Sequence, residues 1–460
     1  MKYILEEQIC LRKWKGDRHC FTISGSGKSF PLSTEEYSLL KLCDGNRELV
    51  PDNSLRIFEL MHVIRRCGTK KEELTPGQIR EYPNFFFRNI DWTITERCNY
   101  NCLHCFHAAD NERHRAAFSK EEAFRMIAEA AQCGVTGIRL TGGEPTLHPH
   151  FREVVEEIGK QGLFLKTLIT NGALLDDELI DFVKKLHPNV QIMLSFDGIG
   201  THDWLRQHKG SEEQVKKTIM ACKNAGLNVK INMNVNRRNR AVVFDSVKML
   251  SDLGVNEVRL IKTTEAPRWQ LNAADDSLTI CEYYDLSAEF AEKYKHSGLR
   301  LPVTIWQSLY LNGEKELFNV LPVKASACRY DEDAPICKAM TNKISVQANG
   351  DIIPCAPLAG LYTLLGIEMG NVKRDGLQKL LTEGPLTDHV MQTVREKRTF
   401  SQKCAGCRFF KNCQGGCPAL SMLFGGNLLS ADDYKCAFFE NGYYDKYLEV
   451  LKGWKNRNPL

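Results

Sequence analysis

Between Asn89 and about residue 265, apolar positions recur along the chain with two alternating periods. Short apolar runs typical of buried strands occur at Ile90–Thr95, Gly137–Thr141, Leu165–Thr170, Gln191–Phe196, Val229–Val235 and Glu257–Ile261. Stretches with helical spacing lie between them, at Lys120–Gln132, Phe151–Gln161, Asp177–Lys185, Glu212–Ala225 and Val242–Leu253. Strands that alternate with helices pair in parallel through crossovers. The pattern therefore predicts an α/β fold, a partial (β/α)6 barrel equal to three quarters of a TIM barrel.

The first 88 residues have a different pattern, in which strands come first and helices follow. The predicted strands are Glu6–Lys13, Cys20–Ser24 and Lys28–Leu32, and the predicted helices run from Ser33 to Asp44-Gly45 and from Ser54 to Cys67. We expect a winged-helix-like unit. It contains no cluster of catalytic side chains, so we predict that it binds a peptide by β-addition at an exposed edge strand. A structural cap on the next domain is the alternative.

After about residue 265 the alternation fades. A helix is predicted at Thr279–Lys295, and Leu301–Leu311 is predicted to be an apolar connector. From Cys328 onward the chain is rich in Cys, Gly and Pro and has little periodicity, so we expect metal cross-links, and not a large apolar core, to order it. The predicted domains are residues 1–88, 89–310 and 311–460.

Composition and charge exclude several classes of protein. The chain has 460 residues, 26% of them charged, and its net charge is only +4, which gives no reason to propose nucleic acid or an anionic membrane as a partner. The first residues do not have the pattern of a signal peptide, and no apolar run has the length of a membrane span. We therefore expect a cytoplasmic protein.

The chain contains 18 cysteines, and in a long chain without a secretion signal metal binding explains them better than disulfides. Most of them fall into two spaced groups. We expect the others to be ordinary thiols: Cys10, Cys20, Cys43, Cys67, Cys133, Cys222 and Cys281.

The first group is Cys98-x3-Cys102-x2-Cys105, directly after the first predicted barrel strand. Barrels of this type carry their chemistry at that end of the strands. A cubane iron–sulfur cluster normally takes four cysteines, so three would leave one iron open to a non-protein ligand. A zinc site is the alternative. The next strand ends in Gly142-Gly143-Glu144, where two glycines allow a ligand to approach the backbone and Glu144 can hold an ammonium group.

With these two motifs together, the sequence resembles the radical S-adenosylmethionine (radical SAM) superfamily. The resemblance implies that Cys98, Cys102 and Cys105 hold a [4Fe–4S] cluster whose open iron binds S-adenosylmethionine. One electron then cleaves this cofactor to a 5′-deoxyadenosyl radical, which abstracts a hydrogen from the substrate. The implied contacts to the cofactor come from residues at the strand ends: Gly142, Gly143, Glu144, Asn171, Ser195, Asp197, Arg206 and Asn234.

Some of these residues have plainer explanations. Ser195 and Asp197 could form only a turn, Arg206 could be a surface charge, and Asn234 is the weakest ribose candidate. His104 departs from the Tyr or Phe that many members of the superfamily have before the last cysteine.

The second cysteine group lies near the C-terminus. Its spacings are Cys337-x12-Gly350-x4-Cys355 and Cys404-x2-Cys407-x5-Cys413-x3-Cys417, followed by Cys436. This pattern resembles the SPASM extension of radical SAM enzymes, which carries two auxiliary [4Fe–4S] clusters. The resemblance implies one cluster on Cys328, Cys337, Cys355 and Cys417, and the other on Cys404, Cys407, Cys413 and Cys436. A pair of zinc-ribbon sites is the alternative.

The SPASM extension resembles enzymes that modify peptides, and the first 88 residues resemble the recognition element that binds the leader of a ribosomal precursor peptide (RiPP). Together these resemblances imply a peptide maturase that installs a thioether, carbon–carbon or ether cross-link, with flavodoxin or ferredoxin as electron donor. Two alternatives stay open. One is a sulfatase-maturating enzyme that makes formylglycine, although Ala356 stands where that family has an Asp. The other is a non-catalytic scaffold. No catalytic residue is assigned.

Overall fold

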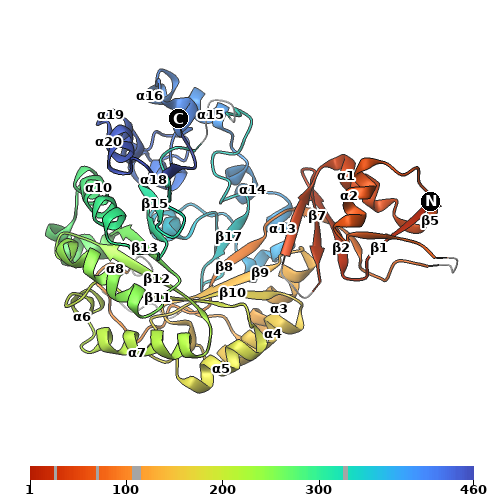
Figure 1. Ribbon diagram of the computed structural model, residues 1–460. Coiled ribbons are helices and arrows are strands. Elements are labelled where there is room, and N and C mark those ends of the chain that lie inside the picture. The colour runs from red at the N-terminus through yellow and green to blue at the C-terminus, as the bar shows by residue number, and fades with distance from the viewer. Residues whose placement is uncertain (25–27, 69–71, 106–115, 325–329, 460) are drawn as a thin grey trace.

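The computed structural model describes residues 1–24, 28–68, 72–105, 116–324 and 330–459. Figure 1 shows an N-terminal unit that projects to one side of a large twisted sheet, with the C-terminal part of the chain packed above that sheet.

The N-terminal unit contains two small sheets. One has four strands in the order β4-β3-β2-β7, and the other has three in the order β5-β1-β6. The strands are β1 (Lys2–Leu5), β2 (Ile9–Lys15), β3 (Arg18–Ile23), β4 (Lys28–Leu32), β5 (Asp44–Glu48), β6 (Ile64–Arg66) and β7 (Ile79–Phe85). The three predicted strands correspond to β2, β3 and β4, and the other four were not predicted.

Two helices accompany these sheets, α1 (Thr34–Lys41) and α2 (Asn53–Leu60). The start of α1 was predicted correctly, because the hydroxyl of Ser33 accepts a hydrogen bond from the Glu36 amide at 3.1 Å. The prediction that the second helix runs to Cys67 is wrong. His62 adopts the left-handed region with φ 54°, which ends the helix, and the following residues pair with β1 as strand β6.

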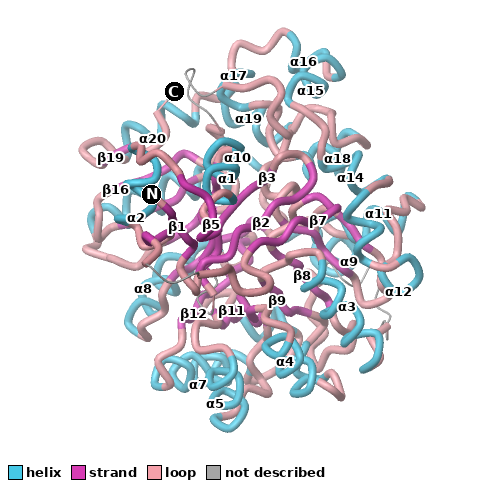
Figure 2. The backbone as a smooth tube through the Cα atoms, turned by 90° about the vertical axis from the view of Figure 1, so that its right-hand side faces the viewer, coloured by secondary structure: helices cyan, strands magenta, loops and turns pink. Residues whose placement is uncertain are grey.

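The central sheet contains the six predicted parallel strands in the predicted order. They are β8 (Asn89–Thr93), β9 (Gly137–Thr141), β10 (Phe164–Ile169), β11 (Gln191–Ser195), β12 (Asn228–Val235) and β13 (Glu257–Lys262). The helices between them are α3 (Lys120–Gln132), α4 (Phe151–Lys160), α5 (Asp177–Leu186), α7 (Ser211–Asn224) and α8 (Val243–Asp252). Figure 2 shows α4, α5 and α7 along one rim of the strands. The parallel α/β fold is confirmed.

The sheet extends beyond these six strands to a total of twelve. One edge adds β14 (Val303–Ile305), β15 (Leu309–Asn312), β16 (Leu317–Val320) and β19 (Lys455–Asn456), and the other adds β17 (Lys343–Val346) and β18 (Ile352–Ile353). The prediction of a connector at Leu301–Leu311 is therefore wrong, because β14 and most of β15 lie in it. The C-terminal region is joined to the barrel directly, since β17 pairs in parallel with β8.

The C-terminal region also has an apolar core, which corrects the expectation that metal alone would order it. The predicted helix is found as α10 (Ile280–His296), and its Tyr284 packs against Phe438 and Tyr443. Short helices follow from α11 (Ala359–Leu365) to α20 (Tyr443–Val450). Most of their buried apolar side chains belong to the same core as the barrel, whereas Val394, Cys404 and Phe410 form a small separate cluster.

The seven scattered cysteines are free thiols, and four of them, Cys20, Cys43, Cys133 and Cys222, are buried as expected. No helix in the described part of the chain has the length and apolar character needed to span a bilayer.

Candidate functional site

The three cysteines Cys98, Cys102 and Cys105 follow β8 in a loop that other elements hold in place. Leu103 donates its amide hydrogen to the carbonyl of Leu205 at 3.0 Å, in helix α6 (His202–Arg206). Arg268, in α9 (Pro267–Ala273), is 3% exposed and donates to the carbonyl of Cys102 at 2.9 Å. The loop backbone is therefore fixed by two helices that come much later in the chain.

The GGE motif is hydrogen-bonded to the segment just before this loop. The Gly143 amide donates to the Thr95 carbonyl at 2.7 Å, and the Glu144 amide donates to the Arg97 carbonyl at 2.8 Å. A Cβ atom on Gly143 would lie 2.5 Å from the Glu96 carbonyl oxygen. The glycines thus permit close contact between two backbone segments, a reason that sequence analysis did not find.

Glu144 is fully buried, and both of its carboxylate oxygens accept hydrogen bonds. Oε1 accepts from the hydroxyls of Thr146 and Thr170, each at 2.7 Å, and Oε2 accepts from the Asn171 amide at 2.8 Å. Burial raises the pKa of Glu144 above its usual value, although these hydrogen bonds oppose the rise. The carboxylate is fixed in orientation at the ends of β9 and β10.

Asp197 and Arg206 form a buried ion pair on the far side of the cysteine loop. Nε of Arg206 donates to Oδ2 of Asp197 at 2.6 Å, and Nη1 donates to Sγ of Cys102 at 3.7 Å. Burial alone would raise the pKa of Asp197, but the Arg206 guanidinium, His202 and His104 together outweigh it and hold that pKa far below the usual range. Arg206 is therefore not a surface charge, and Asp197 does more than form a turn.

Asn234 joins this pair to the cysteine loop. Its amide nitrogen donates to Oδ1 of Asp197 at 2.8 Å, and its side-chain nitrogen lies 3.0 Å from Nε2 of His104. Burial lowers the pKa of His104 to about 3, so the ring is neutral and Nε2 accepts from Asn234. His104, which replaces the Tyr or Phe common at this position, therefore has a hydrogen-bond partner in Asn234.

Two other predicted residues lie at strand ends beside these groups. Nδ2 of Asn171 donates to the side-chain oxygen of Asn99 at 2.7 Å, next to Cys98. Ser195 is the last residue of β11 and lies opposite Asn232 in the sheet. All eight predicted cofactor contacts therefore surround the cysteine loop or end a neighbouring strand. Arg268 and Asn99 were missed, because neither belongs to a spaced motif.

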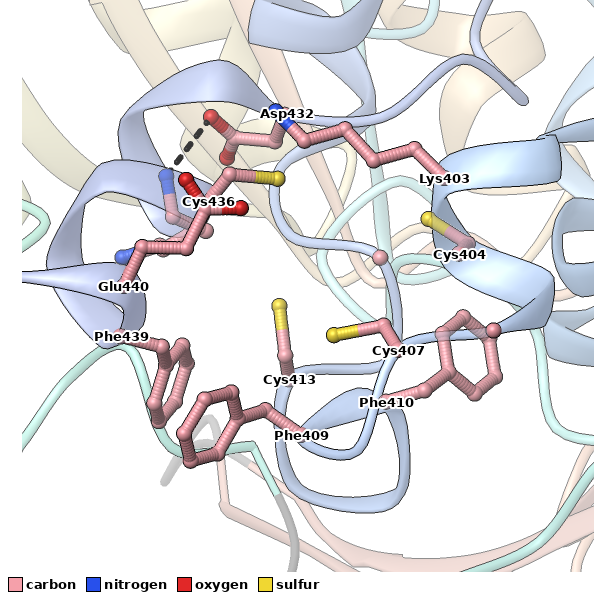
Figure 3. Close-up of a pocket in the computed structure, with 13 residues that line it drawn as sticks. Lys403, Cys404, Cys407, Phe409, Phe410, Cys413, Asp432, Cys436, Phe439 and Glu440 are labelled. Atoms are coloured by element: carbon pink, nitrogen blue, oxygen red, sulfur yellow. Dashed lines mark hydrogen bonds between the residues drawn. The ribbon is translucent and has the colours of Figure 1, made fainter.

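Four cysteines of the second group line one cavity of about 160 Å³. They are Cys404, Cys407, Cys413 and Cys436, and Figure 3 shows their sulfur atoms pointing toward a common space. On one side of the cavity the rings of Phe409 and Phe439 stack, with their centroids 5.0 Å apart. Burial raises the pKa of Cys413 to about 12 and that of Cys436 to about 11. Metals bind cysteine as thiolate, so a metal bound in this cavity would have to displace these protons.

The other cysteines of the group lie apart from that cavity. Cys355 and Cys417 are close enough to Cys337 that its charge raises the pKa of each thiol, in addition to the larger effect of burial. Cys328, the fourth predicted ligand, lies outside the described residues. The described part of the chain contains no group of three or more His, Cys, Asp or Glu side chains placed to hold a single metal ion.

Asp432 links the two cysteine sets. Its Oδ2 accepts from the amide of Cys417 at 2.8 Å, and its Oδ1 accepts from the amide of Tyr434 at 3.0 Å, at the start of α19 (Asp433–Glu440), the helix of Cys436. Two buried lysines lie near this carboxylate. Burial lowers the pKa of Lys397 and of Lys435 to about 8 each.

Comparison with known proteins identifies two family matches. Residues 92–250 match the model of the radical SAM superfamily, and residues 337–408 match SPASM, an iron–sulfur cluster-binding domain. The first match contains the cysteine loop and GGE. The second contains Cys337, Cys355, Cys404 and Cys407, but ends before the last three cysteines.

Similar curated proteins cover most of the chain. The AdoMet-dependent heme synthase of Methanosarcina barkeri is 24% identical over 75% of this chain and 95% of its own length. AlbA of Bacillus subtilis, an antilisterial bacteriocin subtilosin biosynthesis protein, is 24% identical over 81% of this chain and 80% of its own length.

Similar solved structures have the same fold. Streptococcus suis SuiB bound to the precursor peptide SuiA has a TM-score of 0.65 at 16% identity, over 94% of this chain and 99% of that one. Native anSMEcpe with bound AdoMet has a TM-score of 0.58 at 18% identity, over 79% of this chain and 96% of that one.

Proposed function

Because the chain belongs to the radical SAM superfamily of enzymes and carries a SPASM domain, we propose that it matures a ribosomal precursor peptide by installing an oxidative cross-link. One observation carries the choice of substrate. The fold matches SuiB, solved with a precursor peptide, over 94% of this chain, so the match includes most of the N-terminal unit. The similarity to AlbA supports the same substrate class.

The radical SAM domain binds S-adenosylmethionine and a [4Fe–4S] cluster, and together these supply the radical that removes a hydrogen atom from the substrate. We assign the cluster to Cys98, Cys102 and Cys105, whose loop is fixed by Leu103 and Arg268. We assign Glu144, beside this loop, to the amino group of the cofactor. In that role its two hydrogen-bonded oxygens keep the carboxylate fixed without a mobile counter-ion.

Arg206 is the assigned partner of the cofactor's carboxylate, with Asp197 as its positioning residue. Since the ion pair is buried, the guanidinium is held in one orientation before any ligand arrives. Ser195, Asn171 and Asn234 are assigned to the polar groups of the nucleoside, together with the backbone of Gly142 and Gly143.

The SPASM domain binds auxiliary iron–sulfur clusters. We assign one to the cavity of Cys404, Cys407, Cys413 and Cys436, whose converging sulfur atoms support the assignment. The second would use Cys337, Cys355 and Cys417, with Cys328 as the fourth ligand. Forming a cross-link removes two hydrogens from the peptide. One would leave as the abstracted atom and the other as a proton, and an auxiliary cluster held by these cysteines would serve as acceptor for the remaining electron. Flavodoxin or ferredoxin would supply the electron that starts the reaction.

The N-terminal unit, residues 1–88, is assigned to the leader of the peptide. Strand β4 is an edge of its four-stranded sheet, and Phe30 on that strand is 37% exposed. At the other edge, β7 packs against α13 (Leu377–Thr382). Since Pro31 has no backbone N–H, a leader added beside β4 would gain fewer hydrogen bonds than beside an ordinary strand. Side-chain contacts such as that of Phe30 would then carry more of the affinity.

A sulfatase-maturating enzyme is the second candidate, because the anSMEcpe structures match the same fold and include peptide complexes. These structures cover 79% of this chain, a smaller share than SuiB does. In this chain Ala356 follows Cys355 at the start of a short 3-10 helix, so the base expected of that family is missing from this position.

The test is anaerobic reconstitution with iron, sulfide, S-adenosylmethionine, reductant and the short peptide encoded beside the gene. We expect 5′-deoxyadenosine and a peptide that has lost two hydrogens by mass spectrometry. The control is the Cys98→Ala variant, which should yield neither product. The second candidate would be favoured by two results together. The wild type would form deoxyadenosine but leave the precursor intact, and it would convert the cysteine of a sulfatase-derived peptide to formylglycine. No deoxyadenosine from the wild type would contradict both.

A further inference from the structure

The inner face of the barrel sheet carries polar side chains that the proposed cofactor site does not use. Along β8, Ile90 and Trp92 are buried in the core under the helices, so Asp91 between them points to the opposite face. The same alternation places Arg139 of β9 and Arg259 of β13 on that face. Figure 1 shows these strands curving around a common interior, with β17 beside β8.

Three cations and one carboxylate meet in this interior. Nη1 of Arg139 lies 2.8 Å from Oδ1 and 3.0 Å from Oδ2 of Asp91, and Nζ of Lys343 lies 2.5 Å from Oδ2. Arg139 and Lys343 thus share the single negative charge of Asp91, so this group carries a net positive charge.

Arg259 is the third cation, and its guanidinium has no hydrogen bond or ion pair with any described residue. The nearest carboxylate along its strand, Glu257, is paired with Lys230 at 2.5 Å. Burial lowers the pKa of Arg259, and the positive charge of Arg139 lowers it further. Two like charges so placed repel each other in a poorly solvated interior, which is costly unless an anion joins them.

Neutral polar groups beside these cations also lack partners. Ser345 of β17, opposite Asp91 in the sheet, is 1% exposed, and its hydroxyl has no hydrogen-bond partner among the described residues. The side-chain oxygen of Asn232, opposite Arg259, is buried and likewise unpartnered in the described chain. Buried polar groups in native proteins are normally paired, so these two groups are available to a polar ligand.

We propose that this interior, with Arg259 as its central group, binds a carboxylate of the peptide substrate. The inference rests on the proposed function and deepens it, because it adds that the core peptide presents an acidic residue, or its own C-terminus, to the barrel. A planar guanidinium suits a carboxylate through two parallel hydrogen bonds, and Ser345 can donate a third. Charges on Lys343 and Arg259 both influence Cys355, so the bound carboxylate would lie toward the assigned auxiliary cluster.

The competing explanation is that these cations only balance the negative charge of the cluster assigned to Cys355. Both explanations use the same residues, but only a carboxylate site discriminates between a carboxylate and its amide. A charge-balancing role predicts instead that removing Arg259 lowers the reduction potential of an auxiliary cluster and leaves ligand binding unchanged.

The first test needs no precursor peptide. The reconstituted enzyme with S-adenosylmethionine is labelled with phenylglyoxal, which reacts with guanidinium groups, and labelling of Arg259 is followed by peptide mapping. N-acetylglutamate α-amide should slow labelling of Arg259 severalfold, whereas N-acetylglutamine α-amide should not. N-acetylalanine, whose only carboxylate is the C-terminal one, tests the other source. Protection by this probe would mean that the site accepts a peptide C-terminus as well as an acidic side chain. Exposed Arg300 is the internal control and should label equally under all conditions.

Three results of this test would overturn the proposal: equal protection by the acid and the amide, protection by neither carboxylate, or no labelling of Arg259 without a probe. A shift in cluster potential in Arg259→Gln, measured by an EPR-monitored titration, without selective protection would assign the residue to charge balance.

The second test uses the peptide encoded beside the gene. Arg259→Gln should raise the KM for this peptide about tenfold or more, because one partner of a buried charge pair is lost, while the Arg300→Gln control should not. Neutralising the recognised carboxylate in the peptide should raise KM for the wild type but add nothing in Arg259→Gln. Additive effects would contradict the proposal. If this peptide is not modified at all, the proposed function fails for it, while selective protection by the glutamate probe still decides the carboxylate site.

Discussion

Arg206 bridges Asp197 and Cys102, because its Nε is 2.6 Å from Oδ2 of Asp197 and its Nη1 is 3.7 Å from the sulfur of Cys102. Asp197, just after strand β11, thus holds the Arg206 guanidinium beside the cysteine loop, which lies more than ninety residues earlier in the chain. Because Asp197 also accepts from the Asn234 amide, its oxygens are engaged by protein donors. We therefore regard Asp197 as a positioning residue for Arg206 and not as a direct contact to the ribose.

Replacing Asp197 with Asn should leave Arg206 buried without its counter-charge. Breaking a buried pair costs about 3–5 kcal/mol, so we expect a clear loss of stability by denaturant unfolding of the anaerobic holoenzyme. We also expect weaker S-adenosylmethionine binding with the iron content unchanged. The control is Glu213→Gln, which removes a 71% exposed partner of Lys216 and should have little effect. Wild-type affinity for S-adenosylmethionine in Asp197→Asn would argue against a positioning role.

Adding a methyl group at Gly143 should separate GGE from the cysteine loop. The new Cβ would lie 2.5 Å from the Glu96 carbonyl and 2.6 Å from the Arg97 carbonyl, and backbone atoms cannot move aside cheaply. We expect Gly143→Ala to lose S-adenosylmethionine binding and to be less stable by about 1–3 kcal/mol. Gly68→Ala is the control, since among the described residues its Cβ would meet nothing closer than the Glu72 carboxylate at 3.9 Å. Equal cofactor affinity in the two variants would show that the close contact does not matter.

The barrel could be predicted from the sequence because its signal is local. Each strand and helix of the repeat has its own period, and the cysteine loop and GGE are short motifs at strand ends. Arg268 could not be found in this way, because it meets Cys102 only in the folded chain, 166 residues away. The pairing of β17 with β8 was missed for the same reason, since a four-residue strand has almost no period to detect.

The assignment of cysteines to two auxiliary clusters is testable by iron content. Cys436→Ala and Cys404→Ala should each lose about four irons, and the double variant should lose no more, because both side chains line one cavity. Cys436→Ala combined with Cys417→Ala should lose about eight irons, because these residues belong to different sets. Iron analysis with Mössbauer spectroscopy would measure this. A double variant of Cys404 and Cys436 that loses two clusters would contradict the assignment.

The buried thiol of Cys222 should make stability depend on pH. Burial raises its pKa from 9.0 to about 12, so the folded state holds this proton more tightly than the unfolded state. The resulting stability is fully present below about pH 9 and is lost as the pH rises toward 12, by at most about 1.4 kcal/mol per pH unit. Urea unfolding of wild type under reducing conditions should therefore weaken more steeply above pH 9 than that of Cys222→Ala. Parallel curves for the two proteins would contradict the raised pKa.

Substitution of Trp14 should show whether the N-terminal unit takes part in peptide binding or only covers the barrel. Its ring is 2% exposed, stacks on Tyr82 at 5.0 Å, and donates through Nε1 to the carbonyl of Cys133 at 2.9 Å, at the end of α3. Trp14→Ala removes this anchor and costs about 3–5 kcal/mol of packing, so the unit should become susceptible to proteolysis between residues 72 and 88.

If the unit positions the leader for the barrel, Trp14→Ala should raise KM for the precursor peptide, while formation of 5′-deoxyadenosine without peptide stays at the wild-type rate. Trp14→Phe, which keeps an aromatic ring but loses the N–H, should fall between the two. An unchanged KM together with increased proteolysis would mean that the unit is only a cap. The position of Trp14 makes the two roles separable, because its hydrogen bond to the barrel is at the end of α3, to the carbonyl of Cys133, and not at a residue assigned to the cofactor.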